Sequence, residues 1–382
     1  MRFLTAGESH GPALTVIVDG CPAGLRITPS DIDFQLARRQ KGFGRGARQR
    51  IETDRVEVLS GIRRGETLGS PIALLIRNRD HQAWSATMAV EPQDGPSDRA
   101  VTLPRPGHAD LPGALKYDRH DARDLLERAS ARETAARVAA GAVARRLLEE
   151  AGIGIASCVV GIGPIAVKGP ITYQDCLGLD EDMPMPESET RDRAILEIKS
   201  AGERGGTLGG KILVIARGAP PGLGSHTQWD RKLDARLALH FMSIQSAKAV
   251  EVGDGVSTSG AFGKDAHDAI LYSAESGFHH PTNRAGGVEG GMSNGEEIRI
   301  TAYLKPLATL MKPLPSADLI TKKAGRGQIE RSDVCAVPAA AVIGEAVMAL
   351  CLCDALQEKF GGDSVGEFLR NLRAYQDQVR RF

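Results

Sequence analysis

A strand–turn–helix pattern occurs twice in this 382-residue chain, and it constrains the fold more than any other feature. Residues 16–25 (VIVDGCPAGL) are similar to residues 214–223 (VIARGAPPGL), and in both the apolar run ends at a turn rich in glycine and proline. A Val-Glu-Val triplet then follows in each half, at residues 56–58 and 250–252. The matching order predicts an internal duplication. Chance recurrence of a common strand–turn–helix unit is the alternative.

Apolar periodicity and capping signals place the individual elements. Strands are expected at residues 13–18, 56–59 and 71–76, and helices at 29–39, 130–151, 187–199, 229–242 and 338–359. Thr28 with Asp31, and Ser130 with Glu133, are expected to form capping boxes.

The order of these elements favours one large domain of the α+β class. Strands and helices do not alternate regularly, which argues against a doubly wound parallel sheet. We treat residues 1–382 as a single domain with repeats at roughly 1–150 and 205–350. The proline-rich stretch at about 163–202 is expected to be a peripheral excursion.

Composition excludes several classes of protein. Hydrophobic residues make up 42% of the chain, enough for a large core and too many for disorder. Basic and acidic residues number 48 each, so no net charge favours nucleic acid or a membrane surface as partner. Six cysteines form no CxxC pair, which predicts no metal site and reduced thiols in the cytoplasm. Neither a signal segment nor a stretch of transmembrane length is expected.

Two histidines lie in turns and are candidates for acid–base chemistry. His10 lies within Gly7–Gly11 and His108 within Arg105–Asp110. Histidine exchanges a proton near neutral pH, although a single turn histidine is more often structural or exposed.

Basic residues gather in two places. Residues 38–50 hold five arginines and a lysine among glycines, which predicts a clamp for a polyanion. A solvated basic loop or a nucleic-acid patch is the alternative, and the isolated Phe43 argues against base stacking. Arg128 and Arg132 lie at the expected start of a helix, where their charges oppose the helix dipole unless an anion compensates them.

Two further segments are weaker candidates. Residues 283–295 contain glycine pairs that permit close approach of a flat or phosphorylated ligand, with an ordinary turn as the alternative. Asp333 is either a local turn or cap residue or a buried acid–base group. No GxGxxG motif opens a strand–helix unit, so Rossmann-type dinucleotide binding is not supported.

Three of these segments together resemble the chorismate synthase family, namely TAGESHG at 5–11, ERASARET at 127–134 and RSDVC at 331–335. The similarity runs from Met1 to about Asp354. It implies a β-α-β sandwich with internal pseudo-twofold duplication, helices packed between antiparallel sheets, and a homotetramer. Where the family commonly has an Asp-Ser pair before a glycine pair, this chain has Glu203-Arg204, so no role is carried over to that pair.

The resemblance implies anti-1,4 elimination of phosphate from 5-O-(1-carboxyvinyl)-3-phosphoshikimate to give chorismate, the last step of the shikimate pathway. Reduced FMN is the implied cofactor, with no net redox change. His10 would protonate the departing phosphate, His108 would protonate the reduced flavin, and Asp333 would help the flavin N5 accept the C6 proton.

The same match assigns binding residues. Those expected to contact the flavin are Arg128, Ala129, Ser130, Gln245, Ser246, Gly290, Lys305, Pro306, Leu307, Ala308, Thr309 and Arg331. Those expected to bind the substrate anions are Ser9, Arg39, Arg45 and Arg132. In some family members the positions of Arg39 and Arg45 are assigned to NADPH instead.

Two other functions compete with this interpretation. A nucleic-acid-binding protein with a basic loop is disfavoured by zero net charge and 4% aromatic content. Another FMN-dependent reductase would bleach its flavin with substrate. No reductase domain is recognised in the sequence, so we expect a separate enzyme to reduce the flavin.

Overall fold

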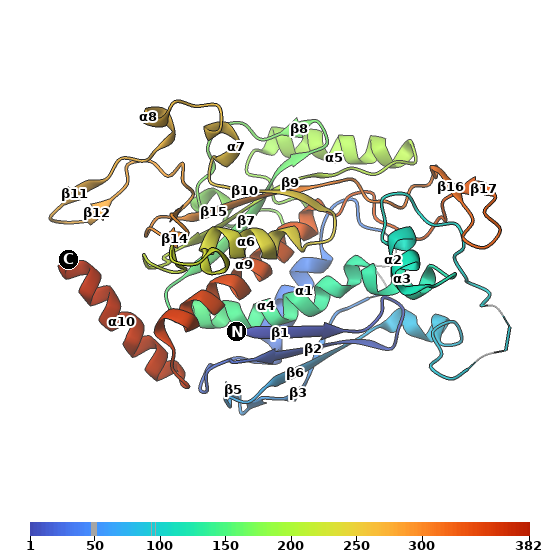
Figure 1. Cartoon of the computed structure of the whole chain (residues 1–382), viewed down its shortest axis with the longest axis horizontal. Helices are drawn as coiled ribbons and strands as arrows, with labels where there is room; N and C mark the ends of the chain where they lie inside the picture. The colour runs from blue at the N-terminus through green and yellow to red at the C-terminus, as the bar shows by residue number, and fades with distance from the viewer. Residues whose placement is uncertain (47–51, 93, 96) are drawn as a thin grey trace.

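The chain mixes helices with antiparallel sheets in the computed structural model, which describes residues 1–46, 52–92, 94–95 and 97–382 (Figure 1). The first sheet has four strands in the order β1 (Arg2–Ala6), β2 (Ala13–Asp19), β6 (Ile72–Arg77) and β3 (Val56–Ser60). Along β2, Leu14, Val16 and Val18 are buried while Ile17 is exposed. This period of two gives the sheet one face for the core.

The second sheet has five strands and is buried more deeply. Its order is β10 (Ala247–Val252), β15 (Ile298–Leu304), β9 (Gly210–Arg217), β7 (Gly154–Ile162) and β8 (Ile165–Ala166). Ile212–Ala216 of the central strand β9 are all buried, because both faces of the sheet are covered. One face packs on α9 (Val337–Phe360), and Ile171 and Cys176 of the excursion pack on the other.

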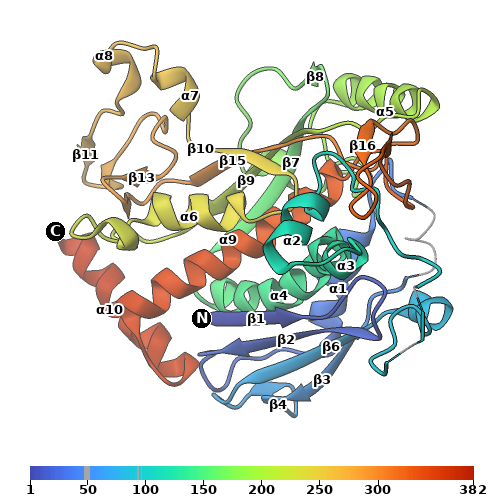
Figure 2. The same ribbon diagram turned by 45° about the vertical axis from the view of Figure 1, so that its right-hand side comes forward.

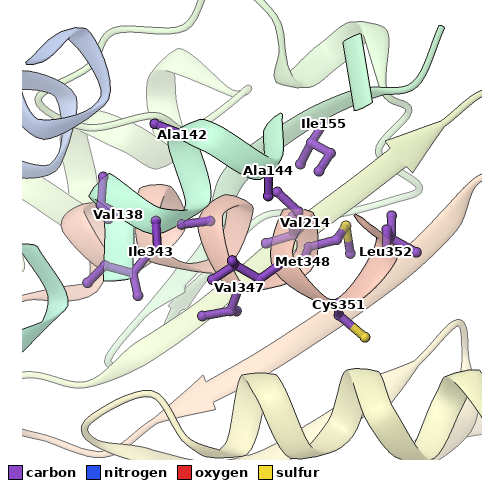
Figure 3. Packing of buried hydrophobic residues seen from close by; sticks show 14 of the residues in the cluster. Val138, Ala142, Ala144, Ile155, Val214, Ile343, Val347, Met348, Cys351 and Leu352 are labelled. Atoms are coloured by element: carbon purple, nitrogen blue, oxygen red, sulfur yellow. The ribbon is translucent and has the colours of Figure 1, made fainter. Parts of the chain in front are cut away.

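Three helices lie between the two sheets, as Figures 1 and 2 show. They are α1 (Pro29–Gln40), α4 (Thr134–Glu150) and α9. α4 contacts the first sheet and α9 contacts the second. The two helices approach so closely that a Cβ on Gly141 would lie 2.4 Å from the Cβ of Ala346. Figure 3 shows Val138 and Ala142 of α4 beside Ile343, Val347 and Met348 of α9.

The apolar character of α9 corrects one sequence expectation. Val337–Phe360 is long and apolar enough to cross a membrane by length and composition, whereas no such stretch was expected. Its apolar window is 89% buried inside the protein, because β7, β9, α1 and α4 pack around it. By its packing it is a core helix, and a helix buried on all sides is apolar on all sides.

Several other predictions about elements are confirmed or corrected. The Thr28–Asp31 capping box opens α1 as predicted. The helix predicted at 229–242 is α6 (Leu233–Met242), preceded by a 3-10 turn at Trp229–Arg231. The predicted helix at 187–199 is α5 (Ser188–Glu203). The C-terminal helix α10 (Val365–Arg381) was not predicted, although Ser364 caps it.

The remaining elements are short and peripheral. They are β4 (Ile62–Arg63), β5 (Glu66–Thr67), α2 (Asp110–Tyr117), α3 (Arg123–Ala129), α7 (Gly255–Thr258), α8 (Gly263–Ala266), β11 (Leu271–Ser273), β12 (Gly277–His279), β13 (Val288–Glu289), β14 (Met292–Ser293), β16 (Pro315–Ala317) and β17 (Ala324–Arg326). The cysteine thiols at 21, 158, 176, 335, 351 and 353 are all free and buried, as expected.

Candidate active site

His10 lies in the loop between β1 and β2 and is held by residues from two other segments. The loop turns at Gly7 (φ +107°), where a Cβ would lie 2.4 Å from the Ala13 carbonyl oxygen, so only glycine fits. The His10 Nδ1 is 2.9 Å from both carboxylate oxygens of Glu127 on α3. Its Nε2 is 3.9 Å from Asp80 Oδ2, and its ring stacks on Trp84 at 3.9 Å between centroids.

His108 is held by its own loop and faces the segment 305–309. The His108 Nδ1 is hydrogen-bonded to Asp110 Oδ1, and the Arg105 guanidinium donates to both oxygens of Asp110. Burial alone would raise the pKa of Asp110, but hydrogen bonds from His108 and Arg105 hold it well below its usual value. Arg105 Nη1 also donates to Thr309 Oγ1 at 2.9 Å.

A buried arginine cluster lies at the inner side of α1 and α4. The Asp54 carboxylate bridges Arg39 and Arg132. Arg39 Nη2 donates to its Oδ2 at 2.6 Å, and Arg132 Nη1 donates to its Oδ1 at 2.6 Å. Arg45 donates to Asp333 Oδ2 at 2.8 Å. All three arginines retain a donor: the buried Nε atoms of Arg39 and Arg45 and the buried Nη2 of Arg132 have no hydrogen-bond partner among the described residues.

Part of the basic segment 38–50 lies outside this description. Residues 47–51, which include Arg48 and Arg50, are not among the described residues. Of the predicted clamp, the structure describes Arg39 and Arg45, Arg38, which enters a different cluster with Glu345, and Lys41, which pairs with Glu181.

The helix-start prediction at Ser130 is wrong. The long helix α4 begins at Thr134, after α3 and a 3-10 turn at Ala131–Glu133. Ser130 accepts a hydrogen bond from the Arg132 backbone N–H and so caps only the short turn, while Glu133 contacts Arg137 and Gln245. The local sequence is ambiguous because a Ser-x-x-Glu pattern caps a 3-10 turn as readily as an α-helix.

The predicted conflict with a helix dipole is also wrong. Arg128 lies in the last turn of α3, where a positive charge is favourable. Its Nη2 donates to the Thr5 carbonyl oxygen at 2.9 Å, and the neighbouring Ser130 hydroxyl donates to the Ser9 hydroxyl at 3.1 Å. Arg132 is compensated by Asp54, an internal carboxylate.

Several predicted flavin residues come together beside these groups. Gln245 Nε2 donates to Glu133 at 3.1 Å, and its buried Oε1 has no hydrogen-bond partner in the described part of the chain. Ser246 takes a positive φ of 72°, and its carbonyl accepts from the Lys305 N–H at 2.9 Å. The Lys305 ammonium donates to the Gly107 carbonyl, and burial lowers its pKa. The segment Lys305–Thr309 thus joins the His108 loop to Ser246.

Arg331 and Gly290, two of the predicted flavin residues, lie in different parts of the molecule. Arg331 Nη2 donates to Asp80 at 2.5 Å and so reaches the surroundings of His10. Gly290 lies in the turn between β13 and β14, which Figures 1 and 2 show at the end of α6 far from α2 and α3. Within one chain, Gly290 is not brought to the other candidates.

Asp333 is not a helix cap. The N-cap residue of α9 is Ala336, and no side chain caps that end. Instead, the Asp333 carboxylate accepts from the Gly46 backbone N–H at 2.7 Å and from Arg45. The helix-cap role raised from the sequence is therefore excluded, and these contacts instead tie Asp333 to the loop at Arg45 and Gly46.

Four partners of the candidate residues were missed from the sequence. Glu127 and Asp110 lie inside the quoted motifs, and Asp110 is only two residues from His108, but nothing local indicated that Glu127 would contact His10. Asp54 lies in a loop and Trp84 ends a 3-10 helix at Arg79–Trp84, and neither belongs to a motif. Glu127, Asp54 and Trp84 are revealed only by long-range contacts, because distant elements bring them to their partners.

The comparisons with known proteins show the family of the chain. The profile of the chorismate synthase family matches residues 1–357. Relatives named chorismate synthase from Desulforudis audaxviator (strain MP104C) and Moorella thermoacetica (strain ATCC 39073 / JCM 9320) are each 52% identical, cover 100% of this chain and are themselves covered to 98% and 99%. A solved structure titled "Crystal Structure of Chorismate Synthase" matches with a TM-score of 0.79 at 39% identity, covering 100% of this chain and 98% of that chain. The chain therefore belongs to the chorismate synthase family of lyases.

Proposed function

We propose that this chain catalyses the anti-1,4 elimination of phosphate from 5-O-(1-carboxyvinyl)-3-phosphoshikimate to give chorismate. The observation that carries the proposal is the buried cluster of Arg39, Arg45 and Arg132, two of which retain an unused Nε donor among the described residues. The substrate carries two carboxylates and a phosphate, and guanidinium groups bind both kinds of anion.

Electrostatics of the cluster favours an anionic ligand. The pKa of Arg39 falls to about 10, chiefly because of burial, and repulsion from Arg132 and Arg45 lowers it further against the attraction of Asp54. An anion bound beside these groups would stabilise their charged forms. We propose that Ser9, Arg39, Arg45 and Arg132 bind the substrate, with NADPH at Arg39 and Arg45 as the alternative ligand.

The proton-transfer roles follow from the orientation of each group. His10 has its Nδ1 on Glu127, so Nε2 is the nitrogen that donates a proton to the departing phosphate. The Asp333 carboxylate, tethered by Arg45 and Gly46, would assist the transfer of the substrate C6 proton to the cofactor. His108, held by Asp110, supplies a proton on the cofactor side of the site.

Residues suited to hold reduced FMN lie between these groups. The buried Gln245 Oε1 accepts no hydrogen bond from the described residues and suits an N–H donor of the isoalloxazine ring. Arg128 to Ser130, Ser246, Lys305 to Thr309 and Arg331 would complete the binding site. When bound, reduced FMN supplies electron density as the C–O bond breaks. Gly290 belongs to this site only if a second copy of the chain supplies it, and we propose the homotetramer expected for the family.

The strand order supports an internal pseudo-twofold duplication. In chain order, the first, second, fourth and third strands of the first half lie side by side as β1-β2-β6-β3, and those of the second half as β7-β9-β15-β10. α1 and α6 each follow the second strand, and α4 and α9 each follow the fourth. We propose that the halves arose by duplication and that the excursion at about 163–202 is an insertion after β7.

The test is anaerobic incubation of purified protein with the substrate and photoreduced FMN, followed by chorismate absorbance. Chorismate formation that requires reduced FMN supports the proposal, and no formation overturns it. We propose that the flavin is reduced by a separate cytoplasmic reductase. Sustained turnover with oxidised FMN and NADPH alone would show instead that this chain reduces its own flavin, and a monomer in light scattering would remove the tetramer.

A further inference from the structure

Glu127 makes the contacts expected of a residue that positions His10. Its carboxylate accepts from the His10 backbone N–H at 2.8 Å, from the His10 Nδ1 at 2.9 Å and from Arg123 Nη1 at 3.0 Å. The Glu127 side chain is 1% exposed. Three charge-assisted or backbone donors thus converge on one buried carboxylate, on a segment far from His10 in the sequence.

The protonation of Glu127 decides which nitrogen of His10 faces the reaction. Burial alone would raise the pKa of Glu127, but hydrogen bonds from His10 and Arg123 lower it below its ordinary value. An ionised carboxylate only accepts hydrogen bonds, so Nδ1 carries a hydrogen and Nε2 is the nitrogen that exchanges a proton.

The plane of the imidazole ring is fixed as well. Trp84 stacks on it at 3.9 Å with 22° between the planes, and the His10 carbonyl accepts from His81 Nδ1 at 2.9 Å. The guanidinium carbons of Arg99 and Arg123 lie 4.0 Å and 5.0 Å from the Trp84 ring centroid. The ring therefore rests against an indole that is itself held by two cations.

We infer that Glu127 is a positioning residue that holds His10 as the Nδ1–H form and directs its Nε2 at the departing phosphate. The inference rests on the proposed function. In the proton transfer, the Nε2 hydrogen passes to a phosphate oxygen as the C–O bond breaks, and the imidazole becomes neutral while Nδ1 keeps its hydrogen. Nε2 is then reprotonated from solvent before the next turnover.

The first test is Glu127→Gln, which keeps the size of the side chain but cannot accept from all three donors. A carboxylate that orients a catalytic histidine is worth up to about 10⁴-fold in kcat, and we expect a loss of at least about 10²-fold. The KM for substrate and the affinity for FMN should stay near wild type. Glu345→Gln, a buried acid that pairs with Arg38 and Arg145 instead, is the matched control and should keep its kcat.

A double mutant separates positioning from a general structural role. In a His10→Ala background, Glu127→Gln should cause no further loss of kcat, because the residue it acts through is absent. An equal loss in both backgrounds, or a normal kcat for Glu127→Gln, overturns the inference.

A measurement on the unmutated protein covers the case in which Glu127→Gln does not fold. Proton and ¹⁵N NMR of histidine-labelled protein should show a hydrogen-bonded Nδ1–H on His10, and the opposite tautomer would overturn the inference. This readout does not need turnover. If the wild type forms no chorismate, the proposed function fails while the tautomer still tests the role of Glu127.

Discussion

Arg38 and Arg39 are neighbours on α1, yet they enter two buried clusters of opposite character. Arg38 joins Arg145 around Glu345, between α1, α4 and α9. Arg39 joins Arg132 around Asp54, beside Arg45 and Asp333. Adjacent residues on a helix point in different directions, which places the two arginines in different surroundings. The sequence alone does not show which surroundings each arginine enters.

The Glu345 cluster is closed on itself. The carboxylate accepts from Arg38 at 2.6 and 2.9 Å, from Arg145 at 2.6 Å and from Ser157 at 2.7 Å. Burial alone would lower the pKa of Arg38, but attraction and hydrogen bonding to Glu345 raise it above its ordinary value. In the other cluster the pKa of Arg39 falls to about 10 and buried donors remain unused among the described residues. The closed cluster has no unused donor among these contacts, whereas the cluster with unused donors is the one proposed to bind the substrate anions.

Cavity volume and unused hydrogen-bonding capacity point to different clusters. A cavity of about 200 Å³ is lined by Arg38, Arg145 and Glu345, whereas the one beside Arg105 and Ala308 measures about 10 Å³. The guanidinium groups at the larger cavity are already hydrogen-bonded to Glu345. The substrate site is therefore proposed on unused hydrogen-bonding capacity rather than on volume.

The largest effect should come from Asp333→Asn at the Arg39 cluster. Asparagine keeps an acceptor for the Gly46 N–H but cannot take up a proton, so chorismate formation should fall roughly 10²–10⁴-fold. Single-turnover chorismate formation under anaerobic conditions, alongside FMN titration, measures this. A small effect on rate, or a loss explained wholly by weaker FMN binding, would make Asp333 only a tether for the loop at Arg45.

The outcome for Asp333 shows what the sequence could and could not supply. The motif RSDVC singled out Asp333 as a candidate. Whether Asp333 caps α9 depends on where that helix begins, and its actual contact is with Arg45, which is far away in the chain. The capped helix α1 was predictable because its signals are local. The start of α4 was not, since α3 and the 3-10 turn before it are set by packing against the His10 loop.

The second-largest effect is expected at the closed cluster around Glu345. Glu345→Gln removes the charge that compensates Arg38 and Arg145, whose side chains are 21% and 24% exposed. Removing one partner of a buried pair costs about 3–5 kcal/mol, and this exposure reduces the expected loss of unfolding free energy to about 2–3 kcal/mol. Denaturant unfolding measures it, with kcat per folded enzyme unchanged. A stable variant with impaired turnover would contradict the division between the two clusters.

A smaller effect on substrate binding should distinguish Arg45 from Arg38. Arg45→Ala should weaken substrate binding roughly 10–100-fold, the worth of a hydrogen bond between charged groups, and leave FMN binding near normal. Arg38→Ala is the matched control, because it removes an arginine from the same segment but from the closed cluster. Equilibrium binding of substrate to both variants measures the difference. Equal affinities would remove Arg45 from the anion clamp.

The smallest effect is the pH dependence of stability at Glu345. Burial alone would raise the pKa of Glu345, but Arg38, Arg145 and Ser157 lower it below the unfolded value of about 4.3. A carboxyl with a depressed pKa stabilises the folded chain above its unfolded pKa, and this contribution is lost as the pH falls through the folded pKa. The gap in unfolding free energy between wild type and Glu345→Gln should therefore be largest near pH 7 and shrink below about pH 4. The shrinkage should reach at most about 1.4 kcal/mol per pH unit, because one proton is involved.

Urea unfolding of both proteins across this range, at constant ionic strength, measures the gap. The Glu345→Gln variant should still lose stability in acid, because Asp54, Asp110 and Glu127 also have lowered pKa values. Only the contribution of Glu345 is removed by the change to glutamine. A gap that stays constant with pH would mean that Glu345 stabilises α1, α4 and α9 through the shape and hydrogen bonds of its side chain. The closed cluster would then owe its stability to packing, and charge compensation would cease to distinguish it from the cluster around Asp54.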